Sequence, residues 1–189
     1  MSPPGRREPV PLAIIHGRFQ PFHIGHLEYL RLARERAREI AVGITNPDSA
    51  LSPPEATDPQ RHRPGDNPFT YWERLLMIEA VLDAEGVAPA RIVPFPIGVP
   101  ARLHAYVPAG AVHLLRVFDD WGAAKVERLR DLGYAVEVLD TDAKKGVSGT
   151  QVRARMRAGG DWRSLVPFPV AEVIEALSLE RAPDRRLAV

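Results

Sequence analysis

The sequence predicts an α/β fold in which a parallel five-stranded sheet is covered by helices on both faces. Short apolar runs, typical of buried parallel strands, alternate along the chain with amphipathic helical segments. Prolines and glycines, 19 and 14 in number, mark where these segments end. Because this alternating order builds a sheet wound on both faces, we expect ligands at the carboxyl ends of the strands.

The expected elements follow one another with one long interruption. Residues 10–16 are an apolar run that ends at a glycine, which predicts the first strand. Apolar residues recur at helical spacing over residues 24–38, which predicts the first helix. Residues 46–68 are rich in proline and lack periodicity, so we expect a long loop there. The other expected strands span residues 39–45, 91–97, 112–117 and 134–139, and the other expected helices span residues 70–85, 121–132, 150–158 and 169–179.

We expect one folded domain over residues 10–180, with a helical end on its C-terminal side. A chain of 189 residues is long enough for one α/β domain with a sizeable core. Residues 1–9 and 181–189 are polar or rich in proline and arginine, so both segments are expected to be loose tails. The sequence shows no internal repeat and no second domain.

The composition narrows the classes of function. A formal net charge of +1 gives no support to binding of nucleic acid or of a membrane surface. The absence of cysteine excludes disulfides, thiolate metal ligands and a cysteine nucleophile. No apolar run is long enough to span a membrane, and the N-terminal segment has no apolar core of the signal-peptide type. We therefore expect a cytoplasmic protein, and we expect it to form a homo-oligomer.

The first candidate site is the segment GRFQPFHIGH, residues 17–26, between the first strand and the first helix. A helix N-terminus favours phosphate, and His23 and His26 are spaced to lie on one side of the first turn. Gly25 permits close approach of a phosphate or a nucleobase, and Arg18 adds a permanent charge. The two histidines could instead merely cap the helix. The full pattern of strand, glycine, proline, histidines and helix favours an anion site.

The second candidate site is KKGVSGTQVR, residues 144–153, at the start of a late helix. Ser148 is the expected N-cap, Thr150 offers a second hydroxyl, and Arg153 follows one turn later. The alternative is a capped helix with a solvated basic face. Because both motifs open helices at the same edge of the sheet, we favour a second phosphate-binding element.

Two further regions are candidates for binding a phosphorylated acceptor. Thr70 and Glu73 have the spacing of a capping box, and Arg74 is predicted to point away from the apolar stripe of its helix. The long loop concentrates Arg61 and Arg63 after a strand end. Our hypothesis is that this loop closes over the acceptor phosphate, although a passive surface loop is an equal alternative.

The segments GRFQPFHIGH, NPFTYWERLLMI, VSGTQVRARM and WRSLVPFPVAEVI together resemble the HxGH-type nucleotidyltransferases, and most closely the archaeal-type nicotinamide mononucleotide adenylyltransferases. The resemblance covers residues 12 to 177 approximately. It implies a Rossmann-like fold and a Mg²⁺-assisted, in-line attack by an acceptor phosphate on the α-phosphate of a nucleoside triphosphate, with release of pyrophosphate. We expect the Mg²⁺ to arrive with the triphosphate, and we assign no protein ligand to it.

The resemblance also implies roles for individual residues. His23 and His26 would contact the triphosphate, and Arg153 would help to hold its β- and γ-phosphates. These three residues are the predicted catalytic set. The predicted nucleotide-binding residues are Gly17, Arg18, Phe19, Gln20, Gly25, Ser148, Gly149 and Thr150, and the predicted acceptor-binding residues are Thr70, Arg74, Arg61 and Arg63.

Two segments depart from the pattern of that family. The loop between Thr45 and Asn67 is longer, and residues 96–122 lack the aromatic and asparagine pattern that holds nicotinamide. Trp121 is a candidate for stacking on a base. The favoured reaction is transfer of AMP to nicotinamide mononucleotide. The altered acceptor region favours the alternative, a cytidylyltransferase or another nucleotidyltransferase for a different phosphate or phosphonate metabolite. A non-catalytic nucleotide-binding regulator is a third reading, against which the two intact motifs argue.

Overall fold

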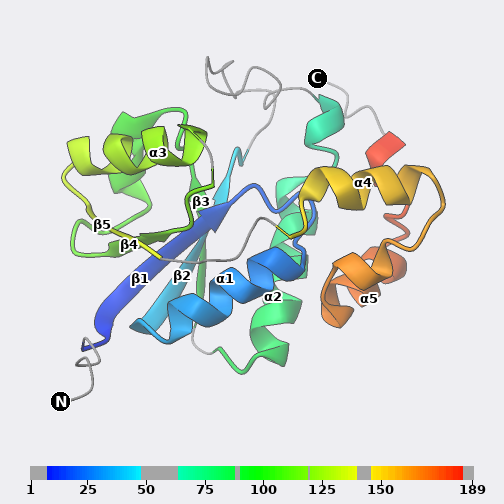
Figure 1. Cartoon of the computed structure of the whole chain (residues 1–189), viewed down its shortest axis with the longest axis horizontal. Helices are drawn as coiled ribbons and strands as arrows, with labels where there is room; N and C mark the ends of the chain where they lie inside the picture. The colour runs from blue at the N-terminus through cyan, green and yellow to red at the C-terminus, as the bar shows by residue number, and fades with distance from the viewer. Residues whose placement is uncertain (1–7, 48–63, 88–89, 119, 140–145, 185–189) are drawn as a thin grey trace.

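The computed structural model describes residues 8–47, 64–87, 90–118, 120–139 and 146–184. It contains one parallel sheet of five strands in the order β3-β2-β1-β4-β5 (Figure 1). The chain starts in the middle of the sheet, runs outward to β3 and then returns to the other side of β1. The switch point of the sheet therefore lies between β1 and β4. The strands are β1 (Val10–Gly17), β2 (Ala37–Thr45), β3 (Arg91–Phe95), β4 (Val112–Leu115) and β5 (Ala135–Val138).

Helices follow the strands in the expected alternation. The C-terminal part is helical, as expected, and α5 packs against α2 there. Short 3-10 turns, Pro64–Asp66, Pro100–Ala105, Arg163–Leu165 and Ala182–Asp184, connect the larger elements. The helices are α1 (Ile24–Arg34), α2 (Tyr71–Ala84), α3 (Asp120–Asp131), α4 (Gly149–Arg157) and α5 (Phe168–Ala176).

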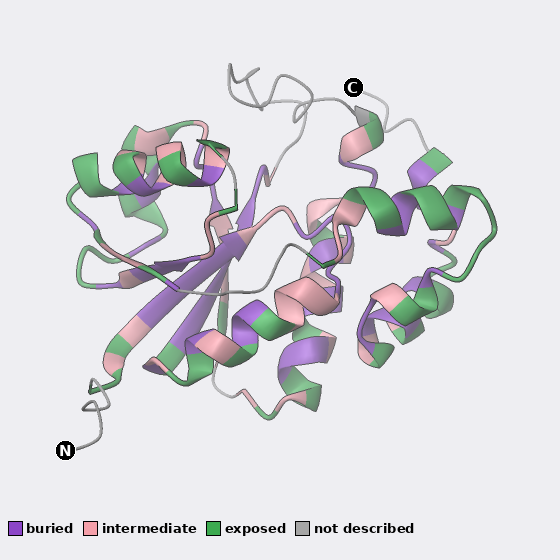
Figure 2. Cartoon of the chain, in the orientation of Figure 1, coloured by how far each residue is buried: buried purple, intermediate pink, exposed green. Residues whose placement is uncertain are grey.

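Apolar side chains fill both faces of the sheet. Ala13 and Ile15 on β1 point into a core shared with α1, α2, α4 and α5. Ile14, between them, points into a second core shared with α3 and the turn at Pro100–Ala105. In Figure 2 most of β1 and β2 is buried, whereas the helices alternate buried and exposed residues. The predicted parallel sheet wound on both faces is confirmed, and its arrangement is Rossmann-like.

The first helix is shorter than its apolar spacing predicts. It ends at Arg34, and β2 already begins at Ala37, two residues before the predicted start of the second strand. The reason is strand pairing, since Ala37 lies beside Val10 in the sheet and the Val10 N–H donates to the Arg36 carbonyl at 2.9 Å. Ala37 continues the helical spacing in the sequence but is buried as the first residue of a strand.

The expected C-terminal tail is wrong for residues 181–184. Residues Ala182–Asp184 form a 3-10 turn in which Ala182 is 1% exposed. The Arg157 guanidinium donates to the carbonyls of Pro183 and Gly65, both at 3.1 Å, which ties this turn to α4. The predicted tail at residues 185–189 and most of the predicted N-terminal tail lie outside the described residues.

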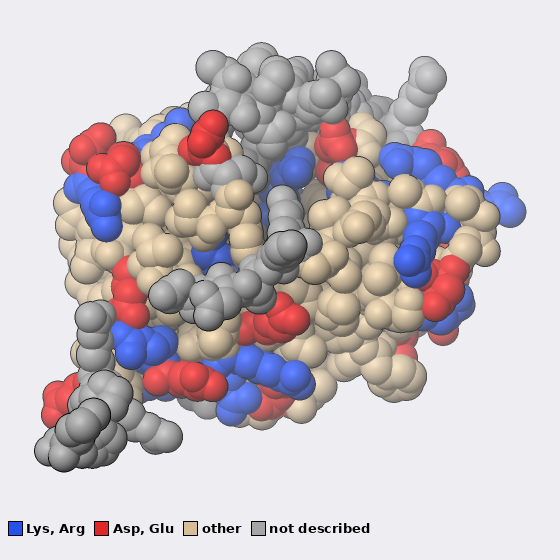
Figure 3. Space-filling model, viewed as in Figure 1, with Lys and Arg blue, Asp and Glu red and all other residues tan. Residues whose placement is uncertain are grey.

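The surface mixes charges of both signs. On the face seen in Figure 3, Lys and Arg side chains are interspersed with Asp and Glu. Within the described ranges, no helix is long and apolar enough to cross a bilayer.

A buried histidine lies in the second core, on β4. The His113 ring is completely buried, with ring centroids 4.6 Å from Tyr134, 5.7 Å from Phe95 and 5.8 Å from His16. Burial lowers the pKa of His113 to about 4, and the nearby charge of Lys125 lowers it further. Since its unfolded value is close to 6.5, the folded protein favours the neutral ring.

This histidine should make stability depend on pH. As pH falls below about 6.5, His113 binds a proton in the unfolded chain but stays neutral in the folded chain. The free energy of unfolding therefore has its full value above pH 6.5 and decreases as pH falls toward 4. The free energy of unfolding, measured in urea, should therefore fall between pH 7.5 and pH 5 by about 1–2 kcal/mol more in wild type than in the His113→Leu variant. His16 and Tyr134 are present in both proteins, so any contribution they make to the pH dependence cancels in the comparison. An equal difference at the two pH values would contradict this expectation.

Candidate functional site

The loop after β1 brings the first motif to the carboxyl edge of the sheet. Phe19 adopts a left-handed backbone, with φ of 51°, which is uncommon for a residue other than glycine, and strained residues of this kind cluster at functional sites. Its ring is 1% exposed and stacks on Phe22 with centroids 5.4 Å apart. This buried ring pair holds the strained turn in place.

His23 and His26 lie against one another at the start of α1. His23 is the N-cap, and the two rings stack with centroids 3.7 Å apart. The backbone N–H of His23 donates to Nδ1 of His26 at 3.2 Å, so the neutral His26 ring carries its proton on Nε2. The edge contact with Phe19, at 4.8 Å, fixes the ring plane. The geometry thus gives His26 a defined N–H donor.

The second motif forms the N-terminus of α4. Ser148 is the N-cap, as predicted, and its hydroxyl accepts from the Gln151 N–H at 3.3 Å. The Gln151 side chain accepts from the Ser148 N–H at 2.8 Å, which completes a capping box. The exposed Thr150 carries a second hydroxyl, which accepts from Arg153 at 3.4 Å. The Ser148 hydroxyl therefore has a structural partner already, and Gly149 and Thr150 follow it in the first turn of the helix.

Arg153 ties α4 to the loop after β1. Its Nη1 donates to the Gln20 carbonyl at 2.8 Å, and its Nη2 donates to the Asp66 carboxylate at 2.6 Å. The side chain is 2% exposed, and Nε has no hydrogen-bond partner among the described residues. Burial lowers the pKa of Arg153, and the charge of Asp66 opposes this effect. A buried guanidinium thus stands between the two predicted phosphate-binding elements.

Gly149 allows α4 to pack directly on the same loop. A Cβ atom at this position would lie 2.8 Å from the Gln20 carbonyl oxygen and 3.2 Å from Nη1 of Arg153. The first of these distances is below any ordinary contact, and a backbone carbonyl cannot swing aside. Glycine at the first position of the helix is therefore what lets the two motifs meet.

Gly149→Ala should separate the two motifs. The added methyl group must push α4 away from Gln20, so we expect kcat/KM for the nucleoside triphosphate to fall about tenfold or more, because small misplacements of binding groups are costly. Gly160→Ala is the matched control, since a Cβ there would have its nearest neighbour at 3.7 Å. Steady-state kinetics and melting temperatures of both variants make the comparison. Equal kinetics for the two variants would mean that the close approach at Gln20 is unimportant.

The two motifs together line a cavity of about 210 Å³, here called the α4 cavity. Arg18 adds a second cation beside Arg153, because its charge contributes, after burial, to the lowered pKa of Arg153. Side chains that donate hydrogen bonds and a helix N-terminus therefore converge on one space. Its lining residues are Gly17, Arg18, Phe19, Gln20, His23, His26, Ser148, Gly149, Thr150 and Arg153.

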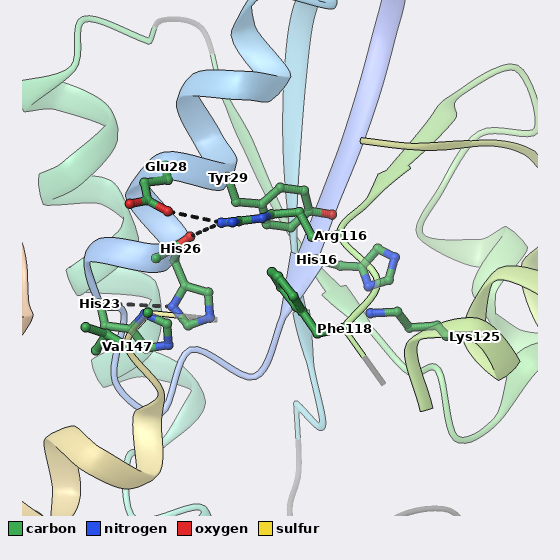
Figure 4. Close-up of a pocket in the computed structure, with 11 residues that line it drawn as sticks. His16, His23, His26, Glu28, Tyr29, Arg116, Phe118, Lys125 and Val147 are labelled. Carbon is green, nitrogen blue, oxygen red and sulfur yellow. Dashed lines mark hydrogen bonds and ion pairs between the residues drawn. The ribbon is translucent and has the colours of Figure 1, made fainter. Parts of the chain in front are cut away.

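A second cavity, here called the β4 cavity, opens at the switch point of the sheet. It shares His23 and His26 with the α4 cavity and has a volume of about 180 Å³. Gly25, predicted to bind the nucleotide, lines this second cavity. Its other lining residues are His16, Glu28, Tyr29, Arg116, Phe118, Lys125, Gly146 and Val147 (Figure 4).

Hydrogen bonds from two elements shape the wall of the β4 cavity. The Tyr29 hydroxyl on α1 donates to the Leu114 carbonyl on β4, which fixes α1 over the switch point. Burial raises the pKa of that hydroxyl. Arg116, directly after β4, donates from Nη1 to the Gly25 carbonyl at 3.1 Å and to Glu28 at 3.3 Å. Its guanidinium lies 4.9 Å from the centroid of the Phe118 ring.

This cavity wall was not predicted from the sequence. Arg116 was placed inside the predicted strand at residues 112–117, whereas β4 ends at Leu115 and leaves Arg116 at the carboxyl edge. A polar residue just after a strand end is the signal that could have found it. The ring centroid of Trp121, the predicted stacking residue, lies 5.3 Å from the Arg128 guanidinium, and the aromatic side chains that line the cavity include Tyr29 and Phe118 but not Trp121.

The predicted outward position of Arg74 is wrong. The side chain is 2% exposed and donates to the carbonyls of Thr45 at 2.8 Å, Asn46 at 2.9 Å and Arg18 at 3.0 Å. A fourth bond reaches the carbonyl of Thr70 at 3.2 Å, and burial lowers the pKa of Arg74 to about 10. Four of its five N–H groups thus donate to backbone carbonyls, so Arg74 links the end of β2 to the first motif.

Of the other predicted acceptor residues, the structure describes Thr70 but not Arg61 and Arg63. The Thr70 hydroxyl accepts from the Glu73 N–H at 3.2 Å, and Glu73 accepts from the Thr70 N–H at 2.9 Å, so the predicted capping box is present. Neither Thr70 nor Arg74 lines either cavity. Arg61 and Arg63 lie outside the described residues, and their binding of an acceptor stays a prediction.

Comparison with known proteins agrees with this arrangement. The cytidylyltransferase-like family model matches residues 14–155. The chain is 47% identical to the phosphonoformate cytidylyltransferase of Streptomyces viridochromogenes over 169 residues, which cover 88% of this chain and 92% of that protein. It is 34% identical to the nicotinamide-nucleotide adenylyltransferase of Methanosarcina acetivorans, with 84% of each chain covered.

A solved structure shares the fold at low sequence identity. The bifunctional NMN adenylyltransferase/ADP ribose pyrophosphatase of Francisella tularensis, complexed with AMP and a manganese ion, superposes with a TM-score of 0.64 at 16% identity. The match covers 93% of this chain and 51% of that one, so this chain spans about half of the larger protein. The predicted nucleotidyltransferase activity is confirmed as a class by the curated relatives. The chain belongs to the cytidylyltransferase-like family of nucleotidyltransferases.

Proposed function

We propose that the protein transfers CMP from CTP to a small acceptor bearing a phosphonate or phosphate group, with release of pyrophosphate. The similarity to a phosphonoformate cytidylyltransferase, at 47% identity over most of both chains, carries this proposal. The departures in residues 96–122, where the nicotinamide-holding pattern is missing, support it as well. Both observations favour CMP transfer, the predicted alternative, over the AMP transfer that was first expected from the sequence.

The two cavities suggest how the nucleotide lies. The triphosphate fits the α4 cavity, where Arg18, Arg153 and the first turn of α4 supply cations and N–H donors. The nucleoside fits the β4 cavity, which is the crevice at the switch point and has aromatic and aliphatic walls. Because His23 and His26 line both cavities, the α-phosphate would lie beside them.

The chemistry that these residues support is one in-line displacement. An oxygen of the acceptor phosphonate or phosphate attacks the α-phosphorus, the bond from that phosphorus to the oxygen bridging to the β-phosphate breaks, and pyrophosphate leaves. His26, which carries its proton on Nε2, donates to the charge that develops on the phosphoryl oxygens, and Arg153 holds the leaving pyrophosphate. No side chain needs to bond covalently to the nucleotide.

A magnesium ion would enter with the triphosphate, because the α4 cavity is lined by cations and N–H donors, which suit the phosphates that carry the ion. Nearby, the Asp66 carboxylate is paired with Arg153 at 2.6 Å. In the part of the chain that the structure describes, no three His, Cys, Asp or Glu side chains gather as a metal site. The bound ion would neutralise charge on the phosphate oxygens and so favour attack.

Transfer of AMP to nicotinamide mononucleotide is the second candidate. Relatives with that activity are 30% to 34% identical to the chain, below the 47% of the phosphonoformate cytidylyltransferase. ATP and CTP share the triphosphate for which the α4 cavity is suited, so this cavity alone does not discriminate between them.

Pyrophosphate release tests both reactions. The purified protein is incubated with Mg²⁺ and CTP or ATP, with phosphonoformate, a simple phosphate ester or nicotinamide mononucleotide as acceptor. We expect turnover with CTP and the phosphonate. Turnover with ATP and nicotinamide mononucleotide in its place would reject the proposal in favour of the second candidate, and nucleotide binding without any turnover would favour the non-catalytic regulator.

A further inference from the structure

Arg116 is a buried cation with an unused donor in the β4 cavity. Its side chain is 8% exposed, and its Nη1 bonds the Gly25 carbonyl and Glu28. Its Nε has no hydrogen-bond partner among the residues described. Buried donors are nearly always paired, so an unpaired guanidinium N–H on a cavity wall indicates a ligand that accepts a hydrogen bond there.

Lys125 brings a second cation to the same cavity from the opposite side. It projects from α3 with its ammonium group toward His16 and Phe118, whereas Arg116 comes from the end of β4 (Figure 4). Arg116 is oriented chiefly by the Gly25 carbonyl, because Glu28 is 61% exposed and such a pair contributes little. The two side chains can only donate hydrogen bonds, so together they favour a ligand edge that carries acceptors.

The remaining wall of the cavity is suited to a flat ring. Tyr29, Phe118 and Val147 supply aromatic and aliphatic surface, and the Gly25 position has no side chain. A planar base can lie against such surfaces through its faces while its edge meets the two cations. The polyanionic part of the nucleotide has its own place in the α4 cavity.

The two candidate bases differ at that edge. Cytosine presents two neighbouring acceptors, O2 and N3, beside its amino group, whereas adenine presents an amino donor beside a single ring acceptor. Two cationic donors can both be satisfied by cytosine. With adenine, one of them would face an amino group, and a site that leaves a buried donor unpaired discriminates strongly.

We propose that Arg116, together with Lys125, binds the carbonyl edge of the cytosine of CTP and thereby selects CTP over ATP. This inference rests on the proposed use of CTP, and it adds the residues that discriminate the base. The inference also explains why the Arg116 guanidinium donates to a carbonyl of the first motif, because that hydrogen bond positions Arg116 next to the nucleotide.

Nucleotide affinity, measured by calorimetry without an acceptor, tests the inference. Wild type, Arg116→Met, Arg116→Lys and Lys125→Met are each titrated with CTP and with ATP in the presence of Mg²⁺. We expect Arg116→Met to bind CTP about tenfold to a hundredfold more weakly, with ATP affinity changed less than about threefold. Arg116→Lys should recover part of the preference, since it keeps a cationic donor without the planar fork.

Two controls separate recognition from folding. Arg130→Ala removes an exposed cation, also on α3, whose guanidinium bonds Glu127 at 2.8 Å, and it should leave both affinities unchanged. Melting temperatures report whether loss of the bond to Gly25 disturbs the fold, and Lys125→Met, on a different element, provides an independent test of the preference.

The outcomes distinguish this inference from the proposed function. Equal weakening of CTP and ATP, or an unchanged preference in both the Arg116→Met and Lys125→Met variants, would overturn the inference even if wild type turns over CTP. The inference would likewise be overturned if the Arg116 and Lys125 variants changed only the KM for the acceptor. Conversely, a preference for CTP that depends on Arg116, in a protein that does not use phosphonate acceptors, would support the inference and reject the proposed acceptor.

Discussion

His26→Ala is expected to lower kcat at least about a hundredfold, because loss of a donor to the developing charge typically costs 10²–10³ in rate. The ring lies where the α4 and β4 cavities meet, and its Nε2 carries the proton in the neutral form. The expected result is therefore a fall in kcat that exceeds any rise in KM for CTP.

The same ring also packs in the loop, so the fold needs a separate check. Its centroid lies 4.8 Å from Phe19 and 5.3 Å from Phe22. His26→Asn keeps a side-chain amide donor with less loss of packing and should retain more activity than alanine. His104→Ala is the matched control, since His104 is exposed and bonds Tyr134 at 2.9 Å on the other face of the sheet. A folded His26→Ala variant with near-normal turnover would remove His26 from the catalytic set.

Arg153→Ala should impair both stability and activity. The change leaves the Gln20 carbonyl without its charged partner and Asp66 without its ion pair, which we expect to lower the free energy of unfolding by about 2–4 kcal/mol. Loss of a cation beside the triphosphate should raise the KM for CTP about tenfold to a hundredfold and also lower kcat. Urea unfolding and steady-state kinetics measure the two effects.

Two further variants separate the effects of Arg153. Asp66→Asn removes the ion pair at 2.6 Å but keeps the arginine, so it should reduce stability while changing the KM for CTP much less. Arg153→Lys should recover only part of the activity, because one ammonium cannot reach Gln20, Asp66 and a phosphate in the geometry of the fork. If Arg153→Ala retained wild-type kinetics, the residue would be a structural tie alone.

The local signals of the chain predicted its helix starts well. Ser148 and Thr70 are N-caps because their short polar side chains satisfy the first free N–H groups, and this depends on residues only three positions away. The end of the first helix was missed because it depends on Val10, which pairs with Ala37 in the sheet. Periodicity contains no information on such distant pairing.

The arginines also show that local sequence predicts a position in a helix but not the tertiary contacts made there. Arg74 and Arg153 carry the same charge and lie four and five residues after a polar N-cap. In the structure Arg153 lines the α4 cavity, whereas Arg74 is enclosed by four backbone carbonyls. Arg116, which the sequence placed within a strand, became a cavity residue because β4 ends one residue before it.

The sequence by itself determined the alternation of strands and helices, the parallel sheet and the two helix N-termini at its carboxyl edge, because caps, periodicity and glycine positions act between near neighbours. Only the tertiary structure decided which cations line a cavity and which are enclosed by the protein's own carbonyls. Three of the four carbonyl partners of Arg74 lie 28 to 56 residues away, and Gly149 meets a carbonyl in a loop more than a hundred residues earlier. A buried cation pairs with whichever acceptor the fold brings within 3 Å, and long-range packing sets that distance.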